Sequence, residues 1–144
     1  MLIYLDTSAL TKLVVEEDET PDLRAWISRR SGQRLVSNAL IRTELRRAVL
    51  RFADRSDVPR DQARLIARRA AALLGQIDQI RLSPPLLDQA GWQPPTQLRS
   101  LDAIHLATAA SLGPDLRTLV VYDRRLSDAA EDLGIAVAAP GRNP

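Results

Sequence analysis

Two aspartates each directly follow a short apolar run. Asp6 ends the run Leu2–Leu5, and Asp123 ends the run Leu119–Tyr122. Short apolar runs are typical of buried strands, and in open parallel sheets ligands bind beyond the carboxyl ends of the strands, near the point where the strand order reverses. Asp6 and Asp123 are therefore candidates for one site at that edge. Capping of the following helix or turn is the alternative role for both residues.

Two further acids fall on predicted helices. Glu44 lies beside the apolar stripe of a helix predicted over 38–53, where it either reaches into a cleft or forms a surface ion pair with Arg47. Asp102 lies two residues after Ser100, which we expect to cap a helix that runs to Leu112. The helix dipole alone favours an acid in that first turn. Spacing by itself leaves the functional and the structural role open for both acids.

The combination of four carboxylates favours a site for a hard cation. Mg²⁺ and Mn²⁺ prefer carboxylate oxygens, whereas four crowded carboxylates without a metal would repel one another. A metal ion held there would activate a water molecule and neutralise the charge that develops on a phosphodiester, as in metal-dependent nucleases.

The composition removes most competing catalytic chemistry. The chain has no cysteine, which excludes disulfides, thiolate zinc sites, iron–sulfur clusters and cysteine nucleophiles. We expect a structural role for the single histidine, His105, with a general base or metal ligand as the alternative. The six glycines are scattered and form no phosphate-binding loop. An aspartyl phosphatase would need a second carboxylate where Ser8 stands, and a receiver domain a lysine after a late strand, where the only lysine is Lys12.

Length and charge describe an ordinary globular chain. A length of 144 residues suits one domain over 1–144, and 45% hydrophobic with 26% charged residues is typical of a folded protein. The net charge is only +2. No apolar run reaches the roughly 18 residues of a membrane span, and the amino terminus lacks a signal-peptide pattern, so we expect a cytoplasmic protein without membrane attachment.

Arginines are frequent between residues 42 and 69. They form either a basic surface for phosphates or an ordinary solvated helical face. The chain has few aromatic residues, which excludes a long platform for base stacking, and we expect Trp26 and Trp92 to be packing residues.

Strands and helices alternate along the chain without hairpin signals. The patterns predict strands at 2–5, 35–37, 80–82, 119–122 and 135–137, and helices at 9–15, 22–30, 38–53, 57–74, 100–112 and 124–133. Gly75 is expected to end the long helix, and 92–97 to be an irregular connection. This order predicts an α/β fold with a mostly parallel sheet.

Four blocks of residues, in this order along the chain, resemble PIN-domain ribonucleases. The blocks are Leu5-Asp6-Thr7-Ser8-Ala9-Leu10, Thr43-Glu44-Leu45, the segment from Leu98 to Ala109 that contains Asp102, and Tyr122-Asp123-Arg124-Arg125-Leu126. More narrowly, the chain is similar to VapC-type toxins of type II toxin–antitoxin systems. The resemblance covers essentially the whole chain and implies a three-layer α/β/α sandwich around a parallel sheet.

The resemblance also implies a function and a set of site residues. Asp6, Glu44, Asp102 and Asp123 would form an acidic pocket that holds one or two Mg²⁺ or Mn²⁺ ions and hydrolyses RNA, with Thr7 or Ser8 supporting the first acid. The protein would form a homodimer and be held inactive by a cognate VapB-like antitoxin.

One position departs from the family pattern. Val121 stands where the family often has threonine or serine, so a polar contact near Asp123 is missing. We predict a metal-dependent endoribonuclease of this type. The alternative is a catalytically inactive PIN-like domain that binds RNA or a protein, with the acids serving as caps and ion pairs.

Overall fold

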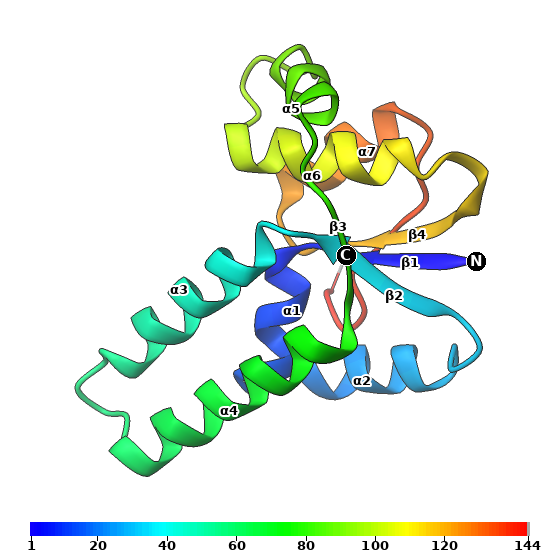
Figure 1. Ribbon diagram of the computed structural model, residues 1–144. Helices are drawn as coiled ribbons and strands as arrows, with labels where there is room; N and C mark the ends of the chain where they lie inside the picture. Colours follow the sequence, from blue (N-terminus) through cyan, green and yellow to red (C-terminus); the bar gives the residue numbers. More distant parts are fainter. Residues whose placement is uncertain (144) are drawn as a thin grey trace.

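Five parallel strands form one sheet in the computed structural model, which describes residues 1–143 (Figure 1). The strands are β1 (Leu2–Leu5), β2 (Arg34–Asn38), β3 (Asp78–Ile80), β4 (Leu116–Val120) and β5 (Val137–Ala138). Their spatial order is β3-β2-β1-β4-β5, and every neighbouring pair is parallel. The predicted α/β class is confirmed, with a sheet that is entirely parallel across the described residues.

The strand order reverses between β1 and β4. From the central strand β1 the chain first adds β2 and β3 on one side, and later adds β4 and β5 on the other. Leu5 is paired with Val120, and the backbone N–H of Asp6 donates to the carbonyl of Val120 at 3.2 Å. The carboxyl ends of β1 and β4 therefore lie side by side at the reversal point, where open parallel sheets place their ligands.

Helices cover both faces of the sheet (Figure 1). One face carries α1 (Thr7–Val14), α2 (Thr20–Ser28), α3 (Ile41–Ala53) and α4 (Arg60–Gln76), and the other carries α5 (Pro84–Gly91), α6 (Ser100–Ser111) and α7 (Arg124–Asp132). A short 3-10 turn, Gly113–Asp115, precedes β4. The predicted three-layer sandwich is thus confirmed. No helix within residues 1–143 is both long enough and apolar enough to cross a membrane.

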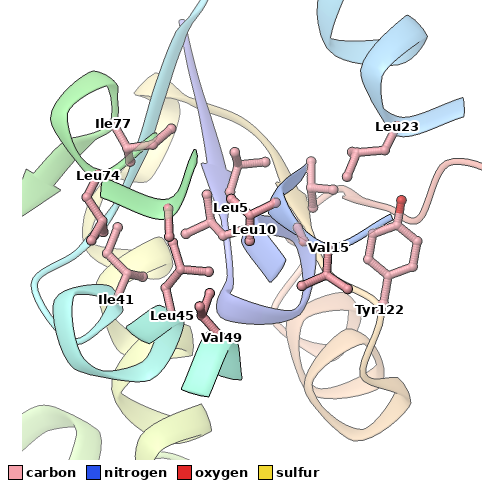
Figure 2. Packing of buried hydrophobic residues seen from close by; sticks show 14 of the residues in the cluster. Leu5, Leu10, Val15, Leu23, Ile41, Leu45, Val49, Leu74, Ile77 and Tyr122 are labelled. Carbon is pink, nitrogen blue, oxygen red and sulfur yellow. The ribbon is translucent and has the colours of Figure 1, made fainter. Parts of the chain in front are cut away.

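Alternate residues of β1 supply the two halves of the core. Ile3 and Leu5 pack with Leu10, Ile41 and other apolar residues of α1 to α4, as Figure 2 shows for part of this cluster. Tyr4, on the opposite face of the same strand, packs in a second cluster with residues of α6 and α7. This alternation follows from the two-residue period of a strand, and it places the end of β1 between the two helical layers.

The helices α3 and α4 form a hairpin that extends away from the sheet (Figure 1). Ile41, Leu45 and Val49 recur every four residues and are buried, which places one face of α3 against the core. The arginines between residues 42 and 69 are exposed on this hairpin.

Several predicted boundaries were wrong. Strand β3 begins and ends two residues earlier than predicted, and β4 ends at Val120 rather than at Tyr122. Gly75 does not end α4, because one interior glycine costs only about 1 kcal/mol and the flanking Leu74 and Ile77 are buried.

Helix α5 was not predicted. Its sequence begins Ser83-Pro84-Pro85, which resembles a break but is a helix start, since the Ser83 hydroxyl accepts the N–H of Leu86 at 3.3 Å and proline suits the first turn. Conversely, Ser100 is the first residue of α6 and caps nothing. Trp26 packs against the core as expected, but Trp92 is 89% exposed and is not a packing residue.

Candidate active site

Asp6 is a buried carboxylate at the end of β1. It caps α1, because its Oδ1 accepts the N–H of Ala9 at 3.0 Å and the hydroxyl of Ser8 at 2.6 Å. Burial raises the pKa of Asp6 to about 6, although the charge of His105 and the two hydrogen bonds lower it. Asp6 therefore has the capping role that was named as its alternative, and its buried surroundings also disfavour its charged form.

Ser8 joins the ends of the two central strands. Its hydroxyl donates to Asp6 and accepts the backbone N–H of Tyr122, which follows β4, at 2.9 Å. Thr7 points elsewhere and donates to Glu44 Oε1 at 3.0 Å. Of the two hydroxyl residues that the family resemblance offered as supports for the first acid, Ser8 is the one in contact with it.

Replacing Ser8 by alanine is expected to lower the free energy of unfolding by about 1–3 kcal/mol. The substitution leaves the N–H of Tyr122 without its partner, and an unsatisfied buried donor carries this penalty. Urea denaturation measures the change. Ser28→Ala is the matched control, because Ser28 is exposed and its hydroxyl only donates to the carbonyl of Arg24, so the loss should stay within about 0.5 kcal/mol. Equal effects of the two substitutions would contradict the role of Ser8.

Glu44 is anchored by His105 and not by an arginine. Its Oε1 accepts from His105 Nε2 at 2.7 Å as well as from Thr7, and no ion pair with Arg47 forms in the described residues. Burial raises the pKa of Glu44, but the hydrogen bond and charge of His105 and the hydrogen bond from Thr7 outweigh it, so this pKa lies below its ordinary value. Spacing left open a surface ion pair with Arg47 or a side chain that points inward, and Glu44 points inward.

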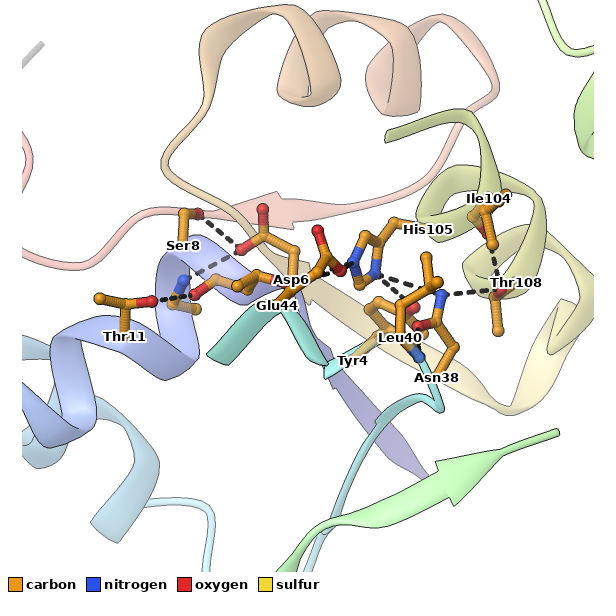
Figure 3. A network of polar contacts seen from close by, with 12 residues as sticks. Tyr4, Asp6, Ser8, Thr11, Asn38, Leu40, Glu44, Ile104, His105 and Thr108 are labelled. Carbon is orange, nitrogen blue, oxygen red and sulfur yellow. Dashed lines mark hydrogen bonds and ion pairs between the residues drawn. The ribbon is translucent and has the colours of Figure 1, made fainter. Parts of the chain in front are cut away.

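His105 is the centre of a buried polar network (Figure 3). Nε2 donates to Glu44, and Nδ1 lies 2.8 Å from the hydroxyl oxygen of Tyr4. Asn38, at the end of β2, donates to Thr108 at 3.2 Å and lies against the same imidazole. The structural role predicted for His105 is that of a connector between the sheet, α3 and α6.

Asp102 and Asp123 complete the predicted set. Asp102 lies half-buried in the first turn of α6, and its pKa is raised by burial and then by the negative charges of Asp123 and Glu44. Asp123 is exposed and caps α7, since its Oδ1 accepts the N–H of Leu126 at 2.9 Å. The charge of Asp102 also raises the pKa of Asp6. The fold thus brings Asp6, Glu44 and Asp123 within electrostatic reach of Asp102.

A common pattern relates the four carboxylates. Asp6, Glu44 and Asp123 each use one oxygen, Oδ1 or Oε1, for hydrogen bonds inside the protein. Within residues 1–143, their second oxygens and both oxygens of Asp102 have no hydrogen bond or ion pair. Each anchored acid is therefore fixed in orientation while it retains a free oxygen for a ligand.

A hollow of about 420 Å³ lies beside Asp123, the one of the four acids that lines it. Its lining includes Thr7, Ser8, Arg51, Tyr122 and Asp123, which come from α1, α3 and the end of β4. It therefore opens at the sheet edge where the strand order reverses.

Comparison with known proteins identifies the family. The family model for the PIN domain matches residues 3–132. The chain belongs to the PIN domain family. This PIN domain is 47% identical over 138 residues to Ribonuclease VapC46 of Mycobacterium tuberculosis, with 96% of this chain and 97% of that protein covered. It is 40% identical over 142 residues to Ribonuclease VapC47 of the same species, with 97% and 98% covered. The resemblance to VapC-type proteins is confirmed.

A solved structure has the same fold as this PIN domain. The structure of FitAB bound to an IR36 DNA fragment superposes with a TM-score of 0.64, covering 99% of this chain and 97% of that one. Their sequences are 18% identical, so this likeness supports the three-layer architecture alone.

The departure at Val121 is accommodated by packing. Val121 is fully buried in the apolar cluster that contains Tyr4, Leu106 and Leu126. Its side chain thus faces the core of this PIN domain, and the Ser8 hydroxyl supplies the polar contact to the backbone of the next residue, Tyr122.

The acids of this PIN domain do not form a closed metal cage. Among residues 1–143, no group of three or more His, Cys, Asp or Glu side chains is arranged to hold a metal ion. The donor chemistry nevertheless fits a hard cation, because the free atoms are carboxylate oxygens and the raised pKa values of Asp6 and Asp102 report charge that a cation would offset.

Proposed function

We propose that this PIN domain is a metal-dependent endoribonuclease toxin that cleaves cellular RNA. The observation that carries the proposal is the free oxygen on each of four acids gathered at the point where the strand order reverses. The nearly full-length similarity to proteins named as VapC ribonucleases supports RNA as the substrate.

We propose Asp6, Glu44, Asp102 and Asp123 as the catalytic and metal-binding residues. They would hold Mg²⁺, with Mn²⁺ as a substitute, and the bound ion supplies Lewis acidity that activates water and offsets charge on the phosphodiester. The chain's own contribution is orientation. Ser8 and the N–H of Ala9 fix Asp6, and His105 and Thr7 fix Glu44.

The proposed partners follow from the VapC type of the chain. We propose a cognate VapB-like antitoxin that holds the enzyme inactive in the cytoplasm, and a homodimer as the active assembly. Co-expression with the neighbouring open reading frame and light scattering of the purified protein test these two proposals.

Metal binding is tested by thermal unfolding. Mg²⁺ or Mn²⁺ is expected to stabilise the chelator-treated protein, by about 2.7 kcal/mol when the metal concentration is a hundred times its dissociation constant, because the ion binds the native state preferentially. Asp102→Asn should abolish most of this stabilisation. Asp128→Asn, which removes an exposed carboxylate from α7, is the control and should respond as the wild type does.

The same experiment separates the rival function. A catalytically inactive PIN-like domain that binds RNA or a protein is favoured by the capping roles of Asp6 and Asp123 and by the absence of a closed metal cage among residues 1–143. An identical metal response in the wild type and in Asp102→Asn would support that rival.

A further inference from the structure

We infer that Arg51 holds an RNA phosphate that flanks the cleaved bond, an inference that rests on the proposed nuclease function. Arg51 belongs to α3 and lines the hollow of about 420 Å³ together with Ser8 and Asp123. RNA that reaches the acids brings its negatively charged backbone close to carboxylates. A cationic side chain beside the site, in addition to the proposed metal ion, therefore favours binding of the RNA backbone.

The other donors of the hollow are already engaged. The hydroxyls of Thr7 and Ser8 donate to Glu44 and Asp6, and that of Thr11 donates to the carbonyl of Thr7 at 2.8 Å. The Tyr122 hydroxyl donates to the carbonyl of Pro140 at 2.8 Å. None of these groups is free to donate to a phosphate.

The hollow has two cationic side chains, Lys12 and Arg51, and only Lys12 is already paired in the described part of the chain. Lys12 is only 10% exposed at its side chain and forms ion pairs with Glu17 and Glu19. Arg51 is exposed, and within residues 1–143 it forms no ion pair and no side-chain hydrogen bond. Its guanidinium therefore keeps all five N–H donors for a ligand, and their fork matches phosphate oxygens.

Helix geometry sets the position of Arg51 relative to the acids. Arg51 follows Glu44 by two turns of α3 and lies on the same face, roughly 10 Å along the axis. Ala48, one turn from each, lines the hollow together with Arg51. Because of this separation along α3, we place Arg51 at a phosphate next to the one that is cleaved. Arg55, by contrast, is paired with Asp57.

The test measures binding apart from cleavage. Fluorescence anisotropy with a labelled single-stranded RNA of random sequence, in Mg²⁺ and in an Asp102→Asn background, gives the dissociation constant at several salt concentrations. Arg51→Ala is expected to raise the dissociation constant roughly tenfold and to reduce the salt slope by about 0.7, the value for one phosphate contact on a single strand. Arg51→Lys should restore the salt slope, because it restores the charge.

Two matched controls test whether the effect is specific to the position of Arg51. Arg117→Ala removes the same charge from the start of β4, at the opposite edge of the sheet. Arg68→Ala removes it from an exposed position of α4 outside the hollow. Both should leave the salt slope unchanged. An equal loss in Arg68→Ala, an unchanged slope in Arg51→Ala, or no RNA binding at all would overturn the assignment.

Cleavage kinetics separate this inference from the proposed function. In the otherwise wild-type enzyme, Arg51→Ala should raise KM roughly tenfold and leave kcat within about twofold, because the contact is made in both the ground state and the transition state. A fall in kcat alone would overturn the assignment. Absence of RNA cleavage by the wild type would refute the nuclease function, and the anisotropy experiment would still report whether Arg51 contacts a phosphate.

Discussion

Replacing Asp102 by asparagine is expected to reduce the rate of RNA cleavage by about 10³-fold while the protein remains folded. Of the four site acids, Asp102 is the one whose side chain has no hydrogen bond or ion pair within residues 1–143, and its pKa is raised by burial and by the neighbouring carboxylates. Its charge is therefore available for a cation, and loss of a metal contact that stabilises developing charge removes several kcal/mol of transition-state stabilisation. Single-turnover cleavage of a labelled RNA at saturating Mg²⁺ measures the rate.

The control for this substitution is Asp128→Asn. Asp128 is exposed on α7, and the same chemical change there should alter the rate by less than about twofold. Circular dichroism and the urea midpoint establish that both variants are folded. A folded Asp102→Asn protein that cleaves at the wild-type rate would exclude Asp102 from the catalytic set.

Replacing Asp6 by asparagine is expected to stabilise the metal-free protein at neutral and alkaline pH. Burial raises the pKa of Asp6 from 3.8 to about 6, so the folded state binds a proton more tightly than the unfolded state does. The free energy of unfolding of the wild type therefore falls as the pH rises from about 4 to about 6, by about 3 kcal/mol in total. Asparagine does not titrate, and it keeps an Oδ1 that accepts from Ser8 and Ala9 and caps α1.

Urea denaturation of both proteins in a chelator, between pH 3.5 and pH 8, tests this dependence. The variant should exceed the wild type by up to about 3 kcal/mol at pH 8, and the difference should vanish below about pH 4. Saturating Mg²⁺ should reduce or reverse the difference, because only the wild type keeps the full set of carboxylates. If the difference in the free energy of unfolding did not depend on pH, burial would not disfavour the charged form of Asp6.

Local sequence patterns predict the individual strands, but they do not predict which strands that lie far apart in the sequence become neighbours. The runs that end at Asp6 and Asp123 mark β1 and β4 because strand burial and helix capping are local signals. Which strands are neighbours depends on the whole chain. The pairing of β1 with β4 joins segments more than a hundred residues apart, and this pairing is what brings Asp6 and Asp123 to one edge.

The network around His105 shows where sequence reasoning stops. Tyr4 and His105 are separated by 101 positions, and nothing in the spacing of either residue indicates the bond between them. Two local signals do exist. Tyr4 has a hydroxyl group in an otherwise apolar strand, and Asn38 is a fully buried amide at the end of β2. Buried polar groups need hydrogen-bond partners. Such residues identify a polar cluster without naming its members.

Boundary errors have a similar origin. The serine and prolines that begin α5 are equally compatible with a turn, and only the packing of Leu86 and Ala90 against α6 selects the helix. The exposure of Trp92 is likewise set by how α5 and α6 meet, which its local sequence does not encode.

The most direct test of the central claim is a transcriptome-wide map of new RNA 5′ ends after brief expression of the wild type, Asp6→Asn and Asp123→Asn. We expect discrete new internal ends with the wild type and their loss in both variants when all three proteins accumulate to equal levels. The same ends in all three strains would contradict the assignment of the acidic site, and no new ends in any strain would contradict the proposal that this PIN domain cleaves cellular RNA.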